Sequence, residues 1–300
     1  MKKTIHYRRV EWFNRQQTDS VVTFIREVLN VRPHIENTRF AIAHEICELR
    51  HRDDLGDKIC LHISTHVAGA RKGVSPQAQG VVNSDLADAP APAGAEFTER
   101  EVALVISEDA VAFVSQGNVH PQFVERAIRG VLALEHPAEI TSRFAVAARA
   151  DPAKVQQLLE EGVHFLDLGL TLDHAEAIQQ IEGQPQSLQS YIGSVITEAI
   201  SARFHEDLTE EEIGDLTTAN AHLVLNFRKS APLEKIEGLT TLATEAIEGE
   251  EDFKIKTRKG NSFSRDQLLL RGNYTQPGPS STLSYVLAWQ NATNFLNVIQ

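Results

Sequence analysis

The chain contains only two cysteines, Cys47 and Cys60, and its single methionine is the initiator. So few cysteines argue against a disulfide scaffold, and one methionine gives no sign of a Met-rich adaptable binding groove. No stretch approaches the roughly 18–20 consecutive apolar residues of a membrane helix. The polar start, Met1 to His6, also lacks the apolar core of a secretory signal. We therefore expect a cytoplasmic protein that does not insert into a membrane.

No complete catalytic motif is present in the sequence. The chain lacks the Gly-x-Ser-x-Gly and Ser-x-x-Lys patterns of nucleophilic catalysis, and its glycines form neither a Walker loop nor a dinucleotide fingerprint. The dipeptide His44-Glu45 begins like a zinc-protease motif, but Glu48 stands where the second histidine is required. These absences favour a binding protein over an enzyme and predict no cofactor.

Charge is distributed unevenly along the chain. The net charge is −12, yet residues 1–75 carry 13 Lys/Arg against 9 Asp/Glu, and residues 251–300 carry 6 against 3. The middle of the chain, residues 76–250, carries 10 against 29. This asymmetry allows an acidic protein to present a local basic face to a polyanion.

Two kinds of apolar periodicity alternate along the chain. Alternating apolar residues, separated by polar or Gly-containing turns, predict strands over residues 4–13, 40–49, 59–67, 102–106, 111–114, 144–148, 163–172, 222–228, 253–257 and 267–270. Helical spacing and capping residues predict helices over residues 21–30, 121–134, 153–161, 188–204, 233–247 and 283–299. This order of elements predicts an α+β fold of mixed sheets with hairpins and packed helices.

A length of 300 residues favours two domains. Residues 84–97 are small and rich in proline, which is typical of a flexible linker or loop. We therefore expect an N-terminal α+β region over 1–83 and a larger α+β domain over 98–300 that ends in an apolar helix. This helix either docks on its own domain or pairs with its copy in a homodimer, with Trp289 as an interface anchor. We favour the dimer.

Six potential metal ligands lie within 23 positions: His44, Cys47, His51, Cys60, His62 and His66. Zinc binds imidazole and thiolate, and alternation places three of them on one face of a predicted strand. Their spacing matches no standard zinc motif, so we expect sheet-surface histidines and half-buried cysteines with no metal. The metal-binding alternative consists of His44, Cys60, His62 and His66.

A basic strand and the turn after it form the best candidate for polyanion binding. Alternation places Lys254, Lys256 and Arg258 on one strand face, near serine and asparagine side chains that can bond phosphate oxygens. A second basic group lies at the N-terminus, and a third follows the first predicted hairpin. The candidate nucleic-acid-binding residues are Lys254, Lys256, Arg258, Lys259, Arg265, Arg8, Arg9, Arg71 and Lys72.

The order of these elements resembles the RexA-type phage-exclusion proteins of lambdoid phages. Both give an N-terminal strand and helix, a hairpin, a short pair of strands near residue 100, and a helix. The present chain then continues with the strand 222–229, a helix and a basic hairpin. The resemblance implies a dimeric, sequence-nonspecific DNA-associating protein of prophage exclusion or anti-phage defence. It covers most of the chain as a pattern and assigns no individual residue. The acidic middle departs from it and argues against extensive DNA wrapping.

These observations predict a homo-oligomeric interaction protein that binds nucleic acid or a phage component in prophage exclusion or anti-phage defence. The expected partners are nonspecific DNA and a phage or host protein. Two alternatives stay open. One is a metal-dependent nuclease or hydrolase that uses the His/Cys group or the acidic residues beside Lys254. The other is an acidic, DNA-mimicking subunit that binds a basic partner.

Overall fold

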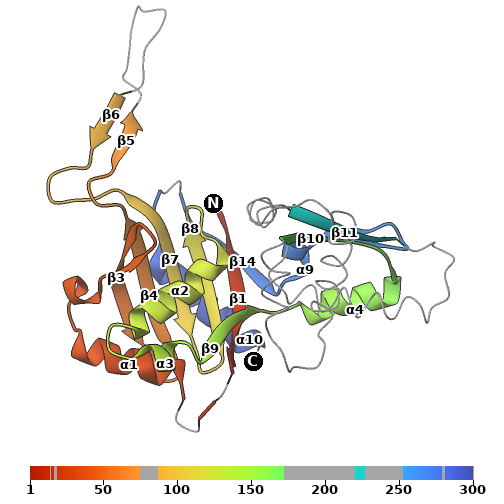
Figure 1. Cartoon of the computed structure of the whole chain (residues 1–300), viewed down its shortest axis with the longest axis horizontal. Helices are drawn as coiled ribbons and strands as arrows, with labels where there is room; N and C mark the ends of the chain where they lie inside the picture. The colour runs from red at the N-terminus through yellow and green to blue at the C-terminus, as the bar shows by residue number, and fades with distance from the viewer. Residues whose placement is uncertain are drawn as a thin grey trace, which may run out of the picture. The chain divides into compact units, whose positions relative to one another are not determined.

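The computed structural model describes residues 1–13, 15–16, 19–74, 87–171, 220–226, 253–278 and 281–299. The chain forms two compact units (Figure 1): unit 1 contains Met1–Ala147 and Arg271–Gln300, and unit 2 contains Ala148–Leu270. Both units combine antiparallel strands with helices, which confirms the predicted α+β class. Among the described residues, no helix is both long and apolar enough to cross a membrane.

Unit 1 is built on an eight-stranded sheet in the order β14-β1-β8-β7-β4-β3-β2, with β9 also paired to β1. Its strands are β1 (Lys2–Trp12), β2 (Phe40–Ile42), β3 (Glu45–Asp54), β4 (Ile59–His66), β7 (Thr98–Ile106), β8 (Ala110–Gln116), β9 (Phe144–Ala148) and β14 (Arg271–Thr275). The predicted β7–β8 hairpin is confirmed. The predicted strand 40–49 is instead two strands, β2 and β3, which pair with each other across a turn at Ala43, and β3 continues to Asp54 and pairs with β4. The pairing of β1 with β14 joins opposite ends of the chain, with Lys2 in register with Thr275.

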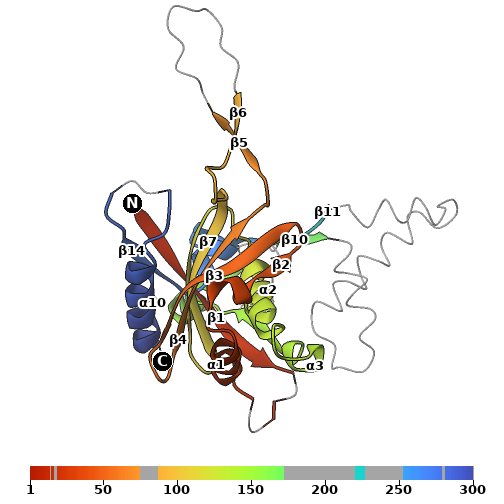
Figure 2. The same cartoon turned by 90° about the vertical axis from the view of Figure 1, so that its left-hand side faces the viewer.

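The central strands carry apolar side chains on both faces. On β4, Ile59, Leu61 and Ile63 are buried in one core, as the alternation predicts. Cys60 points to the opposite face and is equally buried, in a second core. Figure 2 shows the reason, since helices α1 and α2 cover one face of the sheet and helix α10 covers the other. The expectation of half-buried cysteines is therefore wrong.

Helices α1 (Val21–Val31) and α2 (Pro121–Leu132) form where the sequence predicts them. The Ser20 side chain accepts the backbone N–H of Thr23 at the start of α1. Proline begins α2, where its missing N–H and fixed φ suit the first helical position. A 3-10 turn, η1 (Ile35–Thr38), precedes β2, and a short helix, α3 (Ala138–Thr141), precedes β9.

The C-terminal helix α10 (Tyr285–Ile299) docks on the sheet of its own unit. Ala288, Ala292 and Leu296 are fully buried there. Trp289 donates a hydrogen bond from Nε1 to the carbonyl oxygen of Leu61 over 3.2 Å. The structure thus shows the helix docked on its own unit, with Trp289 partly buried against the sheet. A homodimer stays a prediction.

Unit 2 contains a four-stranded antiparallel sheet in the order β11-β10-β12-β13. Its elements are α4 (Pro152–Glu161), β10 (Val163–Thr171), β11 (Asn220–Asn226), β12 (Phe253–Thr257), β13 (Ser262–Ser264) and α9 (Arg265–Leu268). The prediction that residues 267–270 form the hairpin partner of β12 is wrong. Strand β13 pairs with β12 instead, and a capping box between Ser264 and Gln267 begins α9 directly afterwards. The helices predicted over 188–204 and 233–247 lie outside the described residues.

The units divide the chain at positions other than the expected 1–83, 84–97 and 98–300. Strand β4 comes from the expected first region and pairs along its length with β7 from the expected second region. Part of the expected linker forms β6 (Ala87–Pro90), which pairs with β5 (Arg71–Val74) in a separate two-stranded ribbon. One sheet therefore joins both regions, and unit 2 is an insertion between β9 and β14 in chain order.

Helix α2 approaches β2 closely because Gly130 has no side chain. A Cβ atom built at this glycine would overlap the ring of Phe40 on β2. Phe40 in turn packs against the core that α1, α2 and the sheet share. The contact between Gly130 and Phe40 therefore fixes the separation of α2 from the edge of the sheet.

We predict that Gly130→Ala destabilises the protein by about 1–2 kcal/mol. Alanine gains at most roughly 1 kcal/mol over glycine in a helix, whereas overpacking a core costs about 1–3 kcal/mol. Urea unfolding measures the difference. Adding Phe40→Leu should recover much of the loss, and a single variant more stable than the wild type would show that the ring does not rest on the helix.

Candidate functional site

The His and Cys residues of the candidate metal group do not converge. Cys47 packs in the core under α1 and α2, whereas Cys60 packs under α10 on the opposite face. Burial raises the pKa of both thiols to about 12, although the thiolate is the form that binds metals. Among the described residues, no three His, Cys, Asp or Glu side chains are placed to hold a metal ion. The alternative set of His44, Cys60, His62 and His66 lies within these described residues.

His62 is not the sheet-surface histidine that strand alternation suggests, because α10 covers its face of the sheet. Only 6% of the surface of His62 is exposed to solvent. The His62 ring stacks with the rings of His51 and Tyr285, and the centroids of those two rings lie 3.9 Å from each other. Neither ring nitrogen of His62 has a hydrogen-bond partner among the described residues. Burial, together with the nearby His51 and Arg50, lowers the pKa of His62 to about 4.

We predict that acid destabilises the fold through His62. The unfolded histidine titrates near 6.5 and the folded one near 4, so between these values only the unfolded state takes up the proton. The free energy of unfolding should therefore be unaffected above pH 6.5 and fall by up to about 3 kcal/mol as the pH drops to 4. Urea unfolding at about pH 7.5 and about pH 4.5 measures this loss, which should be smaller in His62→Leu.

The control for this experiment is His34→Leu, which replaces an exposed histidine and keeps His62. Its loss of stability on acidification should match that of the wild type. If His62→Leu also loses as much stability as the wild type, buried neutral His62 does not cause the acid sensitivity.

Strand β12 exposes two lysines on one face. Lys254 and Lys256 are exposed, whereas the residues between and beside them are buried. On β13, Ser264 and Ser262 stand in register with these lysines. On β10, the ring centroid of Phe165 lies 4.9 Å from Nζ of Lys256. Cations, hydroxyl groups and an aromatic ring therefore meet on one side of this sheet.

The turn after β12 is fixed to the end of α4 by a carboxylate. Glu161 accepts hydrogen bonds from Oγ1 of Thr257 at 2.6 Å and from Nδ2 of Asn261 at 2.8 Å. The hydrogen bonds from Thr257, Gln157 and Asn261 lower the pKa of Glu161 to about 2. The charged form of Glu161 thus holds the turn that carries Lys259.

The other two candidate cations of unit 2 are less accessible. Arg265, at the start of α9, is 8% exposed, and Arg258 is half-buried in the turn. Lys254, Lys256 and Lys259 are exposed. These three lysines form what we call the β12 face, together with the adjacent β13 serines and Phe165.

The candidate cations of unit 1 lie on separate elements. On β1, Arg8 is 3% exposed and Arg9 is exposed. On β5, Arg71 donates to a main-chain carbonyl of β6, and Nζ of Lys72 lies 3.3 Å from the carboxylate of Glu99. The candidate cations of unit 1 are therefore distributed over β1 and the β5–β6 ribbon.

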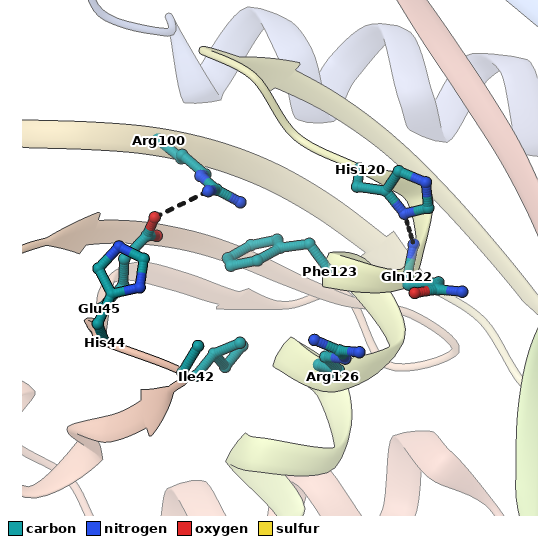
Figure 3. A pocket seen from close by; sticks show the side chains of 9 residues that line it. Ile42, His44, Glu45, Arg100, His120, Gln122, Phe123 and Arg126 are labelled. Carbon is teal, nitrogen blue, oxygen red and sulfur yellow. Dashed lines mark hydrogen bonds and ion pairs between the residues drawn. The ribbon is translucent and has the colours of Figure 1, made fainter. Parts of the chain in front are cut away.

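Unit 1 also contains a pocket of about 240 Å³, shown in Figure 3. It lies between the turn that joins β2 to β3, strand β7 and the first turns of α2. The close contact of α2 with β2 at Gly130 holds two of these walls together. The pocket is lined by Ile42, Ala43, His44, Glu45, Arg100, His120, Gln122, Phe123 and Arg126.

An ion pair between the buried Glu45 and the partly exposed Arg100 forms one side of the pocket. Nη2 of Arg100 lies 2.9 Å from Oε1 of Glu45. The same guanidinium lies 5.7 Å from the ring centroid of Phe123. The other carboxylate oxygen, Oε2 of Glu45, is buried and has no hydrogen-bond partner among the described residues. Arg126 is exposed on α2 and forms no hydrogen bond or ion pair within the described part of the chain.

The ends of two elements orient the pocket's imidazoles. His44 follows Ala43, whose φ of 53° places it in the left-handed region and turns the chain from β2 into β3. His120 is the N-cap of α2, and its Nδ1 accepts the backbone N–H of Gln122. Figure 3 shows the two rings on opposite sides of Phe123. The first turn of α2 contains no acidic residue.

Sequence reasoning named two pocket residues, His44 and Glu45, and only in metal-binding patterns: His44 in the metal-binding alternative, and both in the rejected zinc-protease motif. Glu45, Arg100 and Arg126 come from three separate segments, so no local motif connects them. Arg126 also lies between apolar neighbours of an amphipathic helix, where an arginine is usually a solvated surface residue. The pairing of β3 with β4 and of β4 with β7 brings Glu45 to Arg100, and the packing of α2 against β2 adds Arg126.

Comparison with known proteins adds no relative, because no protein-family model, curated protein or solved structure matches this chain.

Proposed function

We propose that this protein binds nucleic acid without sequence preference through the β12 face of unit 2. The placement of Lys254 and Lys256 on one exposed strand face, with serines in register, carries the proposal. Lysines attract phosphates of any sequence, and hydroxyl groups add hydrogen bonds to backbone oxygens. The half-buried ring of Phe165 beside Lys256 offers a surface for stacking an unpaired base.

The charge of the whole chain limits the affinity of this face. The net charge of −12 opposes the approach of a polyanion at low ionic strength. We therefore expect weak binding that salt abolishes readily, because few phosphates are neutralised and screening acts over about 8–10 Å.

The biological setting that we propose is prophage exclusion or anti-phage defence. The resemblance between the order of elements predicted from the sequence and that of RexA-type proteins supports this setting. A homo-oligomer fits weak sites, because two linked faces on one DNA strand raise the overall affinity without new contacts. A phage or host protein is the alternative partner of this proposal.

We predict that Lys254→Glu/Lys256→Glu weakens binding to unrelated DNA sequences about tenfold or more at low salt. Two lost phosphate contacts should also flatten the slope of log affinity against log salt by roughly 2. Fluorescence anisotropy with labelled oligonucleotides of unrelated sequence, over a series of KCl concentrations, measures both quantities.

The matched control is Lys2→Glu/Lys154→Glu, which changes the net charge equally and leaves the β12 face intact. It should reduce affinity only slightly and keep the salt slope of the wild type. Equal losses in the two double variants would attribute binding to overall charge, and unchanged binding by Lys254→Glu/Lys256→Glu would remove β12 from the interface.

A further inference from the structure

We propose that the pocket of unit 1 binds a phosphate monoester carried on a hydroxylated sugar, the chemistry of a nucleotide or a pentose phosphate. This site lies in unit 1 and does not depend on the β12 face. Its basis is the charge, the hydrogen-bonding state and the size of the pocket in Figure 3.

The cations of the pocket suit a phosphate group. Arg126 is exposed and has no partner within the described part of the chain, so its guanidinium is available to two phosphate oxygens. It lies in the second turn of α2, one turn beyond the His120 cap. Because the first turn of α2 contains no acidic side chain, no protein carboxylate from that turn competes for this position.

His120 supplies a further donor to the same group. Its Nδ1 accepts the backbone N–H of Gln122, so the proton of the neutral ring is on Nε2. Nε2–H can therefore donate to a phosphate oxygen. His44 stands on the other side of Phe123 and adds a second imidazole from the β2–β3 turn.

The carboxylate of Glu45 indicates that the ligand also carries a hydroxyl group. One of its oxygens pairs with Arg100, but Oε2 is buried without a hydrogen-bond donor among the described residues. An unsatisfied buried charged oxygen is unfavourable, and a ligand hydroxyl would satisfy it. Rotation about the last bond of the glutamate side chain costs little energy. The carboxylate can therefore turn an oxygen toward the pocket, and the partly exposed Arg100 side chain can move with it. A simple inorganic anion would be repelled by this carboxylate.

The size of the pocket limits the ligand. A volume of about 240 Å³ lies below the usual range for drug-sized ligands, roughly 300–1,000 Å³. It fits a phosphate and one sugar ring, with the sugar lying against the apolar surface of Ile42 and Phe123. A base attached to that sugar would extend past the pocket toward solvent.

Isothermal titration calorimetry of the full chain tests the proposal with ribose 5-phosphate, adenosine 5′-monophosphate, adenosine and inorganic phosphate. Both phosphorylated sugars should bind saturably and more tightly than inorganic phosphate, and adenosine should not bind measurably. Arg126→Gln should weaken the binding of ribose 5-phosphate about tenfold or more, because the charge-assisted hydrogen bonds to the phosphate are lost. Arg9→Gln, at an exposed arginine elsewhere in unit 1, should leave the affinity unchanged.

Glu45→Gln separates a ligand contact from general electrostatics. Removing the negative charge should leave inorganic phosphate binding unchanged or tighter, whereas exchanging a charged acceptor for the neutral amide oxygen of glutamine should weaken the binding of ribose 5-phosphate about threefold or more. Lys254→Glu/Lys256→Glu should bind ribose 5-phosphate like the wild type even where DNA binding is lost, so failure of one proposal does not imply failure of the other.

The source of the phosphate is identified by comparing a 5′-phosphorylated trinucleotide with its 5′-hydroxyl form and with the free mononucleotide. A trinucleotide that binds as tightly as the mononucleotide, and only when phosphorylated, identifies a strand end, whereas binding of the mononucleotide alone identifies a free nucleotide. Absence of saturable ribose 5-phosphate binding, equal binding of adenosine and its monophosphate, or wild-type affinity in Arg126→Gln would overturn the proposal.

Discussion

The fold depends on the burial of both faces of β4, β7 and β8. Each of these strands places large apolar side chains in the core under α1 and α2, and small or apolar side chains in the core under α10. A strand with two apolar faces is stable only when both are covered, since each exposed methylene group costs about 0.8 kcal/mol. The sheet therefore requires a helix from the C-terminal end of the chain as well as helices from its first half.

This requirement accounts for the arrangement of the chain around unit 2. Strand β14 must return to pair with β1, and α10 must then reach the second face of the sheet, so residues inserted after β9 form a unit with its own sheet. The close approach of α10 to the sheet uses Gly272, where a Cβ atom would lie 2.9 Å from the Phe295 ring. The same closure buries His62 beside Tyr285, which gives the fold its expected sensitivity to acid.

Local signals in the sequence predicted most of the described elements. The Ser20 cap and the proline that opens α2 marked helix starts correctly, and alternation identified the β7–β8 hairpin. Contacts between distant segments could not be predicted in this way. Alternation alone assigned one face of β4 to solvent, because nothing within β4 indicates that a helix more than two hundred residues later covers Cys60 and His62. The β12 face was visible as a strand pattern, whereas the pocket joins the β2–β3 turn, β7 and α2 and leaves no local motif.

The two cysteines allow a direct test of the two-faced core, because Cys47 reports on the face under α1 and α2 and Cys60 on the face under α10. The measurement is the rate at which a thiol reagent labels each cysteine under native conditions, in the wild type and in Leu296→Ala. Both thiols should be protected in the wild type. Loosening α10 should accelerate labelling of Cys60 much more than that of Cys47. Rapid labelling of Cys60 in the wild type, or an equal acceleration at both cysteines, would contradict the claim that α10 closes the second face of the sheet.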